Sequence, residues 1–454
     1  MIKRLIITAV MILSIASCGP RDYTIHVKTP ARPAGQQDAL QMTAEPLETV
    51  RIGFVGLGMR GYGAIKRYIH MPGIEIKAIC DAEDDNIQRT LRALDYNGLP
   101  EPATYGGEDG WKQLCERDDL DLVYVCTDWS MHAKIGVYAM EQGKHAAIEV
   151  PAAVTLEDIW ALINTSERTR RHCIQLENCC YDFFEMHALA AAQAGAFGEI
   201  LHVEGAYHHN LDHFWDKYWH NWRMEANRKY AGDLYPTHGL GPVCQVLNIH
   251  RGDRFKTLTA MATKPVNGPR HVRARGGDDS SFAGGDETCT MIRTENGKTI
   301  LVEHDVMTPR PYSRMYQLVG TDGYVSKYPI PQVTLREGSF EDKEYGREKT
   351  YSREKADSIL IAYPIPILTD ELLAMAREVG GHGGMDFIMD YRLIYCLRNG
   401  LPLDMDVYDL AEWCCLRELG AISMEHGGAP VEVPDFTRGA WDRLDGFSYA
   451  FASE

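Results

Sequence analysis

Positive charge is in short supply in this sequence. Its 47 Lys and Arg residues stand against 64 Asp and Glu residues, which gives a formal net charge of −17. The acidic residues are spread along the chain and are not massed in a tail. A nucleic-acid partner needs a basic face to neutralise phosphates, so this balance argues against one. The 454 residues are enough for two substantial globular domains.

The cysteines are not spaced as metal ligands usually are. The adjacent pairs Cys179–Cys180 and Cys414–Cys415 do not have the spacing of a metal site. Others, such as Cys126 and Cys173, lie in apolar runs, where cysteine packs as a small hydrophobic residue. A chain of this length also needs no disulfide framework. We therefore expect no structural metal.

The longest apolar run, near the N-terminus, is too short for a convincing membrane span. "MIKRL" gives a basic start and "LIITAVMILSIAS" an apolar core, which together predict a signal peptide over residues 1–17. The following Cys18 in "IASCG" resembles a lipidated bacterial lipobox cysteine, although a plain secretory signal with a chance cysteine is the alternative. We expect an exported, membrane-anchored lipoprotein, on the periplasmic side, with a flexible tether over 18–48.

The pattern after the tether predicts two domains in the α/β class. Short apolar runs ("VRIGFVG", "EIKAICD", "LDLVYVCT", "HAAIEV", "CIQLEN") alternate with helical patterns, which is typical of a parallel sheet. Later runs alternate in polarity, and Asn296–Gly297 between two of them indicates a hairpin. "RMYQLVGTDGYVSKY" indicates a second hairpin, and Gly400 is expected to close a helix. We predict a Rossmann domain over 49–170 and an α+β domain with a large mixed or antiparallel sheet over 171–454.

"GFVGLGMRG" is a candidate nucleotide loop. It places Gly56, Gly58 and Gly61 in a GxGxxG pattern after a strand and before a helix, the context that dinucleotide binding requires. These glycines permit the tight turn, the approach of a pyrophosphate and close helix–strand packing. Asp81 ends the second strand, where a carboxylate binds ribose hydroxyls and repels an added phosphate, so NAD is favoured over NADP. A glycine-rich turn without a ligand is the alternative.

Two further segments indicate a family. "CTDWSMH" and "IEVP" look like the glucose–fructose oxidoreductase and inositol dehydrogenase superfamily, but Val150 replaces its usual lysine before the proline. With "AGDLYPTHGLGP", "LENCCY", "PRPY", "GHGGMD" and "PDFTRG", the chain resembles glycoside hydrolase family 109, the NAD-dependent α-N-acetylgalactosaminidases, over about residues 49–440. Only ten residues separate "GAYHHN" from "NWR", where family members carry a longer insertion, so the identity of the sugar is left open.

The resemblance implies hydrolysis through transient oxidation. Tightly held NAD⁺ takes hydride from carbon 3 of the sugar, and the ketone acidifies the hydrogen on carbon 2. A base removes that proton, the aglycone leaves, water adds, and the held NADH reduces the ketone. This route differs from the usual two-carboxylate mechanism of glycosidases. A cofactor regenerated in place also suits an exported enzyme.

Proton transfer is assigned to three residues. His238 and Tyr235 lie three apart in "YPTH" and can point at one ligand if a helix starts there; the resemblance makes His238 the main base. Tyr181 follows a strand end, where ligands of open α/β sheets gather, and is the second candidate. Glu149 is expected to contact the cofactor or a sugar hydroxyl, with proton transfer as a further role. A lone Tyr or His is more often a core or surface residue.

The remaining site residues follow from the loop and the resemblance. The expected cofactor contacts are Gly56, Gly58, Met59, Arg60, Gly61, Asp81, Trp129, His132, Glu149, Val150, Asn178 and Tyr235. The expected sugar contacts are Tyr207, Arg223, Tyr235, His238 and Tyr312. His208 and His209 could be ligands, but a strand alternates its faces, so at most one of the two should point inward, and we favour a structural role for them. Trp215, Trp219 and Trp222 either stack on a sugar or form a helix packing face.

Two other functions remain open. One is an oxidoreductase of the same superfamily that releases a keto-sugar, which turnover without added cofactor would exclude. The other is a non-catalytic sugar- or nucleotide-binding lipoprotein. The superfamily also suggests a homodimer through the mixed sheet.

Overall fold

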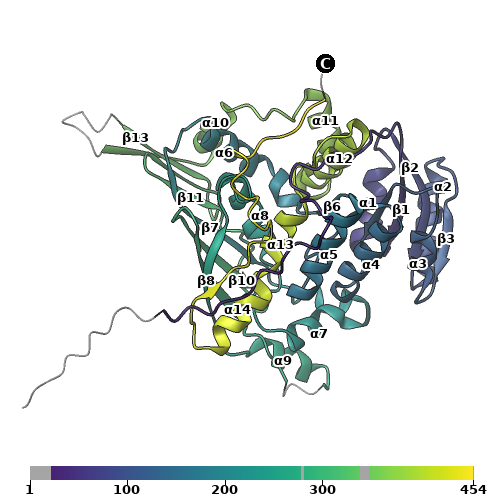
Figure 1. The fold of residues 1–454 in the computed structure, drawn as a ribbon, viewed down its shortest axis with the longest axis horizontal. Helices are drawn as coiled ribbons and strands as arrows, with labels where there is room; N and C mark the ends of the chain where they lie inside the picture. Colours follow the sequence, from purple (N-terminus) through teal and green to yellow (C-terminus); the bar gives the residue numbers. More distant parts are fainter. Residues whose placement is uncertain (1–21, 278–280, 338–346, 453–454) are drawn as a thin grey trace, which may run out of the picture.

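The computed structural model describes residues 22–277, 281–337 and 347–452. The expected signal peptide and Cys18 lie outside this part of the chain. Figure 1 shows the two sheets on opposite sides of the molecule, with helices such as α8, α12 and α13 between them. The chain is therefore α/β in class, with a parallel-sheet domain followed by a mixed-sheet domain, as predicted.

The first domain is a six-stranded parallel sheet in the order β3-β2-β1-β4-β5-β6. This order reverses direction between β1 and β4, which is where open α/β sheets bind ligands. Its strands are β1 (Val50–Val55), β2 (Ile74–Asp81), β3 (Ala103–Gly106), β4 (Leu122–Val125), β5 (His145–Ile148) and β6 (Cys173–Gln175). Its helices are α1 (Met59–Tyr68), α2 (Asp84–Tyr96), α3 (Gly110–Cys115), α4 (Trp129–Glu141) and α5 (Leu156–Thr169). Strand β6 extends the sheet past the expected boundary at 170, and β3 was not predicted.

The second domain is built on a nine-stranded sheet in the order β14-β13-β12-β11-β7-β10-β9-β8-β15. Neighbouring strands are antiparallel except β7 and β10, which are parallel. The strands are β7 (Ile200–His208), β8 (Phe255–Ala262), β9 (Glu287–Thr294), β10 (Thr299–Asp305), β11 (Gln317–Gly320), β12 (Gly323–Ser326), β13 (Gln332–Glu337), β14 (Arg347–Ser352) and β15 (Val431–Glu432). Both expected hairpins are confirmed, as β9–β10 and β11–β12.

Helices and short turns cover this sheet and connect it to the first domain. The α-helices are α6 (Phe183–Gln193), α7 (Trp222–Lys229), α8 (Thr237–Val246), α9 (Asn267–Ala274), α10 (Glu354–Ile361), α11 (Asp370–Val379), α12 (Met385–Asn399), α13 (Val407–Cys414) and α14 (Leu416–Glu425). The 3₁₀ turns are η1 (Asn178–Tyr181), η2 (Trp215–Lys217), η3 (Trp219–Asn221) and η4 (His382–Gly384). Gly400 ends α12 in the left-handed conformation at φ 65°, as expected. No helix in the described ranges is long and apolar enough to cross a membrane.

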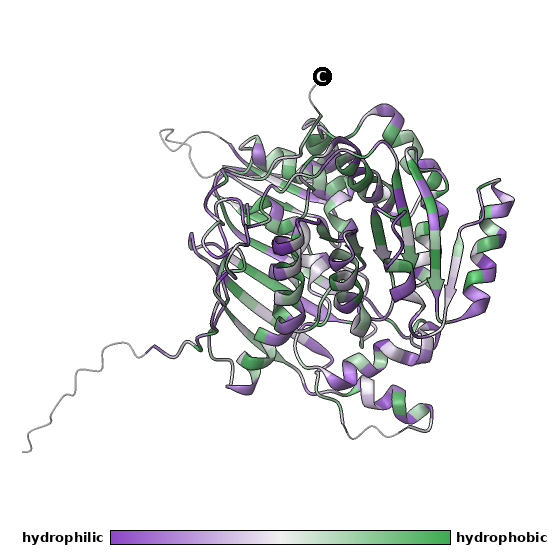
Figure 2. Cartoon of the chain, turned by 45° about the vertical axis from the view of Figure 1, so that its right-hand side comes forward, coloured by the Kyte–Doolittle hydropathy of each residue, from purple (hydrophilic) through white to green (hydrophobic). Residues whose placement is uncertain are grey.

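The two domains share one core. Figure 2 shows hydrophobic residues along the strands of both sheets and hydrophilic residues on the outer helices. A buried ionic link ties α1 to α12: the Arg67 guanidinium lies 2.6 Å from Asp390, which also accepts a hydrogen bond from the Tyr124 hydroxyl. All three groups are buried and have lost their hydration, and their mutual contacts offset that loss. The link fixes α12 against the nucleotide-binding half.

The N-terminal segment is not the free tether that its composition predicts. From residue 22 it packs on the folded body, and Ala39 and Met42 are buried. Arg32 pairs with Glu167 at 3.1 Å, and the Ala39 amide donates to the Tyr408 hydroxyl at 2.9 Å. The expectation of a flexible tether over 18–48 is therefore wrong for residues 22–48, because these long-range contacts fix the segment.

Candidate active site

The glycine-rich loop forms a cradle at the carboxyl end of β1. Gly56 has φ +88°, and a Cβ there would lie 2.6 Å from the Cys126 carbonyl oxygen. At Gly61 a Cβ would lie 1.8 Å from the Gly56 oxygen, so only glycine permits this approach of α1. Nothing lies within 4 Å of the Cβ position of Gly58, which leaves its backbone open to a pyrophosphate. Met59 and Arg60 then begin α1, whose N-terminus favours an anion.

Asp81 is held in place at the end of β2. One carboxylate oxygen accepts the Leu57 amide at 2.5 Å, and the other accepts the Glu83 amide at 2.9 Å. These bonds tie the carboxylate to the glycine loop and to the start of α2. Asp81 therefore lies beside the phosphate cradle, at the position where a ribose would be bound.

Glu149 belongs to an ionic network on the cofactor side. Its carboxylate is 2.8 Å from Nη2 of Arg60, and Nη1 of the same guanidinium lies 3.6 Å from Asp386. Asn178 donates to the same Asp386 at 2.5 Å. Because Glu149 is buried and paired with Arg60, this geometry favours cofactor contact over proton transfer. Val150, next in the chain, offers no ionisable group.

Trp129 and His132 lie at the start of α4. Trp129 stacks edge-on against Trp222 at 5.0 Å and is the link between α4 and the second domain. Both ring nitrogens of the buried His132 lie 2.9 Å from backbone carbonyls, those of Pro151 and Thr127. Burial lowers the pKa of His132, so the neutral ring donates through one nitrogen while the other only faces a carbonyl, and His132 holds the loops after β4 and β5 in place.

A cage of aromatic rings surrounds Arg223. The rings are those of Trp129, Tyr207, Tyr218 and Tyr235, whose centroids lie 4.9 to 5.9 Å from the guanidinium carbon. One guanidinium nitrogen donates to the Tyr218 hydroxyl at 2.7 Å. The other two nitrogens of Arg223, Nε and Nη2, are buried and make no hydrogen bond of good geometry, although the Tyr207 hydroxyl lies close enough to interact with the guanidinium. Unpaired buried donors are costly, so this arrangement suits an acceptor group on a ligand.

His238 lies at the open edge of the cage. Its ring is 4.9 Å from that of Tyr235 and 5.2 Å from that of Tyr207. A Cβ on Gly205 would lie 2.3 Å from the Gly239 oxygen, so two facing glycines let α8 approach β7 and bring His238 to Tyr207. Burial raises the pKa of Tyr235 and of Tyr207, which keeps both phenols protonated.

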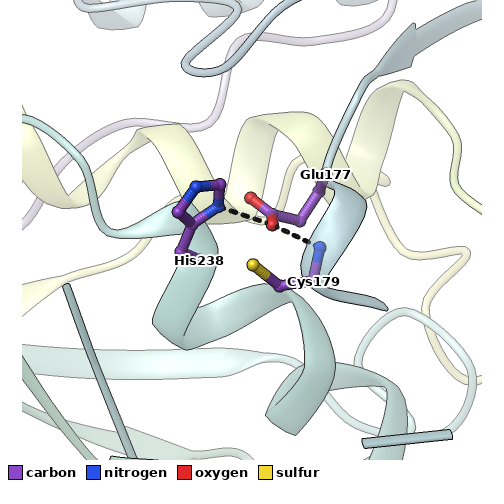
Figure 3. A group of neighbouring side chains, drawn as sticks. All are labelled: Glu177, Cys179 and His238. Carbon is purple, nitrogen blue, oxygen red and sulfur yellow. Dashed lines mark hydrogen bonds and ion pairs between the residues drawn. The ribbon is translucent and has the colours of Figure 1, made fainter. Parts of the chain in front are cut away.

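Glu177 was missed by the sequence analysis, yet it contacts His238. Figure 3 shows its carboxylate between the His238 ring and the backbone of Cys179. Its Oε1 atom lies 2.7 Å from His238 Nδ1 and accepts the Cys179 amide at 3.1 Å. Glu177, Cys179 and His238 have the residue types of a metal site, but Glu177 and His238 are joined by a direct hydrogen bond. The signal that could have found Glu177 is an acidic residue at the carboxyl end of an apolar strand.

Tyr181 does not reach this site, which contradicts its expected role in proton transfer. Its ring is buried, and its hydroxyl donates to Asp404 at 3.0 Å. Asp404 is in turn paired with Arg392 at 2.6 Å. The η1 turn after β6 therefore directs Tyr181 toward α12, while Glu177, at the start of the same turn, reaches His238.

The paired histidines point to opposite faces of β7. His208 is buried beside Glu303, at 3.1 Å, away from the cage. His209 accepts or donates a hydrogen bond with the Tyr207 hydroxyl at 2.7 Å and faces the Tyr312 ring at 5.2 Å. His209 is thus a neighbour of the site, contrary to its structural assignment. Tyr312, an expected sugar contact, lies at the exposed rim.

The three tryptophans after β7 do not form one helix face. Trp215 is buried in η2, and Trp222 packs on Trp129. Trp219 is 48% exposed, and its indole donates to Glu83 at 2.8 Å. Glu83 lies two residues after Asp81, the carboxylate expected to bind the ribose. The Trp219–Glu83 bond therefore connects the segment that contains Trp219 to the cofactor domain.

A buried acid lies beneath the cage. One carboxylate oxygen of Asp233 accepts the Tyr235 amide at 2.9 Å and lies 4.0 Å from His304 Nδ1. Burial raises the pKa of Asp233 to about 7 and lowers that of His304 to about 3. At pH 7, His304 is therefore neutral and Asp233 is about half protonated, under the turn that presents Tyr235 and His238.

These features define a nicotinamide-dependent enzyme with a polar and aromatic site in its second domain. Residues 50–176 match the model of the oxidoreductase family with an NAD-binding Rossmann fold, and residues 181–443 match that of the glycosyl hydrolase 109 C-terminal domain. Among solved structures, levoglucosan dehydrogenase in complex with NADH and L-sorbose has a TM-score of 0.62 at 19% identity, covering 86% of this chain and 100% of that one. At this identity the likeness concerns the fold.

Curated relatives are much closer in sequence. A Bacteroides thetaiotaomicron protein called glycosyl hydrolase family 109 protein 1 is 60% identical over 436 residues, 94% of this chain and 93% of its own. A Porphyromonas gingivalis protein called glycosyl hydrolase family 109 protein is 58% identical over 436 residues, with the same coverage. The chain belongs to glycoside hydrolase family 109. It is an NAD-dependent glycosidase, and NAD is its cofactor.

Proposed function

We propose that this protein hydrolyses α-N-acetylgalactosaminides, or glycosides of a related sugar, through transient oxidation at carbon 3. The observation that carries this proposal is the position of His238, an imidazole 4.9 Å from the Tyr235 ring of the Arg223 cage, in a chain where Val150 leaves the usual lysine position without an ionisable group. When bound, NAD supplies a hydride acceptor for carbon 3 and later returns the hydride. The base for the sugar must then come from the second domain.

Each group of site residues has a role that follows from its chemistry. The loop of Gly56, Gly58 and Gly61 would hold the pyrophosphate, and Asp81 the ribose. His238 accepts a proton from the sugar, because a neutral imidazole is a base near neutral pH. Tyr207 and Tyr235 stay protonated and can donate hydrogen bonds to sugar or leaving-group oxygens.

Arg223 would orient the sugar. Its buried Nε and Nη2 atoms, which make no hydrogen bond of good geometry within the protein, can donate to an acceptor oxygen such as an acetamido carbonyl. The aromatic rings of the cage exclude water around it, which strengthens such bonds. The family resemblance favours N-acetylgalactosamine, and the short segment before α7 is the reason to include related sugars.

We also propose that the protein is exported and anchored through lipidated Cys18, and that it forms a homodimer through the nine-stranded sheet. The signal-like start and the lipobox resemblance support the anchor. Met261 and Met291, on strands β8 and β9, are exposed on the sheet, and such apolar surface supports a protein contact. Metabolic labelling with a fatty-acid analogue would test the anchor, and light scattering of the purified protein would test the dimer.

The deciding experiment is proton NMR of purified protein with an aryl α-N-acetylgalactosaminide in heavy water, without added NAD. We expect free sugar that carries deuterium at carbon 2, which requires both the oxidation–elimination cycle and a resident cofactor. Free sugar without deuterium would contradict the elimination step. A keto-sugar that appears only when NAD is supplied would instead indicate an oxidoreductase.

A further inference from the structure

Glu177 and His238 form a buried pair built by two separate elements. Glu177 follows β6, has no exposed surface, and is presented by the first turn of η1. His238 is the second residue of α8. A Cβ on Gly241 would lie 2.7 Å from the Cγ atom of Glu177, so the glycine at this turn of α8 makes room for the glutamate. The 2.7 Å contact thus depends on local packing from both sides.

We infer that Glu177 is a positioning residue that holds His238 with its proton on Nδ1 and thereby leaves Nε2 as the atom that takes the substrate proton. The inference rests on the proposed function for the identity of that proton. Glu177 was not among the predicted site residues, and it acts on the reaction only through His238.

The direction of the hydrogen bond follows from charge. Burial alone would raise the pKa of Glu177, but its charge interaction and hydrogen bond with His238, together with hydrogen bonds from Thr237 and the Cys179 amide, hold it below its usual value. Glu177 is therefore an ionised carboxylate, which can only accept hydrogen bonds. Since Oε1 lies 2.7 Å from Nδ1, that nitrogen must be the donor, and the lone pair of the neutral ring is on Nε2.

The proton balance is simple. When His238 acts as the base, a bond from hydrogen to a sugar oxygen or carbon breaks and an Nε2–H bond forms. The electron pair of the broken bond stays on the sugar, and Glu177 keeps its charge and stabilises the imidazolium. The Nε2–H proton then exchanges with solvent, and Nε2 returns a solvent-derived proton to the sugar at the end of the cycle.

The surrounding groups do not replace this carboxylate. Tyr207, Tyr235 and His209 face His238, and burial lowers the pKa of His209 to about 4, which leaves it neutral. Cys179 and Cys180 lie beside Glu177, and burial raises the pKa of both thiols, so neither carries charge. Among these neighbours Glu177 is the one anion in contact with His238.

The first test is Glu177→Gln, which keeps the shape and an acceptor oxygen but removes the charge. We expect kcat to fall roughly 10²- to 10⁴-fold, the range seen when general base catalysis is impaired. The carboxylate stabilises the imidazolium, so without it the ring releases its proton more readily and the acidic limb of kcat/KM moves to lower pH. Unchanged kcat and an unmoved limb, in a variant that retains its NAD, would overturn the inference.

The matched control is Glu185→Gln. Glu185 is equally buried but pairs with Arg314 at 2.6 Å, away from His238. We expect this variant to lower the unfolding temperature without moving the acidic limb. Equal limb shifts in both variants would assign the effect to general loss of packing and refute a specific role for Glu177.

The second test needs no turnover. Nitrogen-15 NMR of the parent protein should show the Nδ1–H tautomer of His238, assigned by comparison with His238→Ala, and Glu177→Gln, whose amide can present either its oxygen or its NH2 group to the ring, should weaken that preference. An Nε2–H tautomer in the parent would refute the inference even if hydrolysis is confirmed. If instead the tautomer is as expected but no glycoside is cleaved, the proposed function fails while the positioning role stands.

Discussion

The two sheets differ in what they contribute to the site. The parallel sheet gathers its cofactor groups along one edge, and each of them follows directly from a strand end: Gly56, Asp81 and Glu149. The nine-stranded sheet contributes Tyr207 from one strand, while Arg223, Tyr235 and His238 come from helices and turns packed on it. The cofactor-binding groups thus lie along one rigid sheet edge. The sugar-binding groups come from separate elements, so their residues can change without altering the cofactor site.

His238→Ala should separate the two sides with the largest effect. We expect kcat to fall by roughly 10³-fold or more, because the sugar loses its base, while bound NAD stays at the parental level. Steady-state hydrolysis and the absorbance of cofactor released on denaturation measure the two quantities. Loss of NAD in this variant would show that the sides are not independent.

Asp81→Ala should act on the cofactor side alone. The variant removes the acceptors for ribose hydroxyls and the brace on the glycine loop, so resident NAD should fall at least about 10-fold. Activity should return when millimolar NAD is added. A variant that purifies with full NAD would remove Asp81 from the cofactor site.

Asp233→Asn should have the smallest effect on catalysis. We expect it to change the pH dependence of the free energy of unfolding instead. The pKa of Asp233 is raised to about 7 in the folded protein, so the folded state binds a proton that the unfolded state releases above about pH 4. The parent should therefore lose stability as pH rises from about 4 to 7, by at most about 4 kcal/mol, and the asparagine variant should not.

Thermal unfolding of both proteins between pH 4 and 8 tests this. The variant's advantage should grow across the window and level off above pH 7. His304 titrates in both proteins, so it cancels in the difference. An advantage that shrinks with rising pH would mean that Asp233 is ionised and stabilising in the folded state.

The parts of the fold that could be predicted are those whose signals are local. The glycine loop, Asp81 and the Asn296–Gly297 hairpin each depend on residues within one turn or one βαβ unit. Glu177 could not be paired with His238 because 61 positions separate them. Tyr181 was misassigned because proximity to a strand end does not fix the direction of the side chain after a 3₁₀ turn.

The prediction for the N-terminal segment was wrong because it, too, depends on contacts that are distant in the sequence. Its composition indicates a tether, yet its contacts lie more than 100 positions away, as in the Arg32–Glu167 pair. Composition describes how a segment behaves alone, and it cannot show which surface the segment will meet.

That segment also finishes the large sheet. Ile25 donates to the Pro430 carbonyl at 2.8 Å and accepts the Glu432 amide at 2.9 Å, which adds a parallel bridge outside the edge strand β15. Open strand edges recruit other chains, and proteins blunt them by covering them. Removal of residues 22–48 would expose this edge, so a shortened protein should aggregate through β-strand pairing even if its active site is intact.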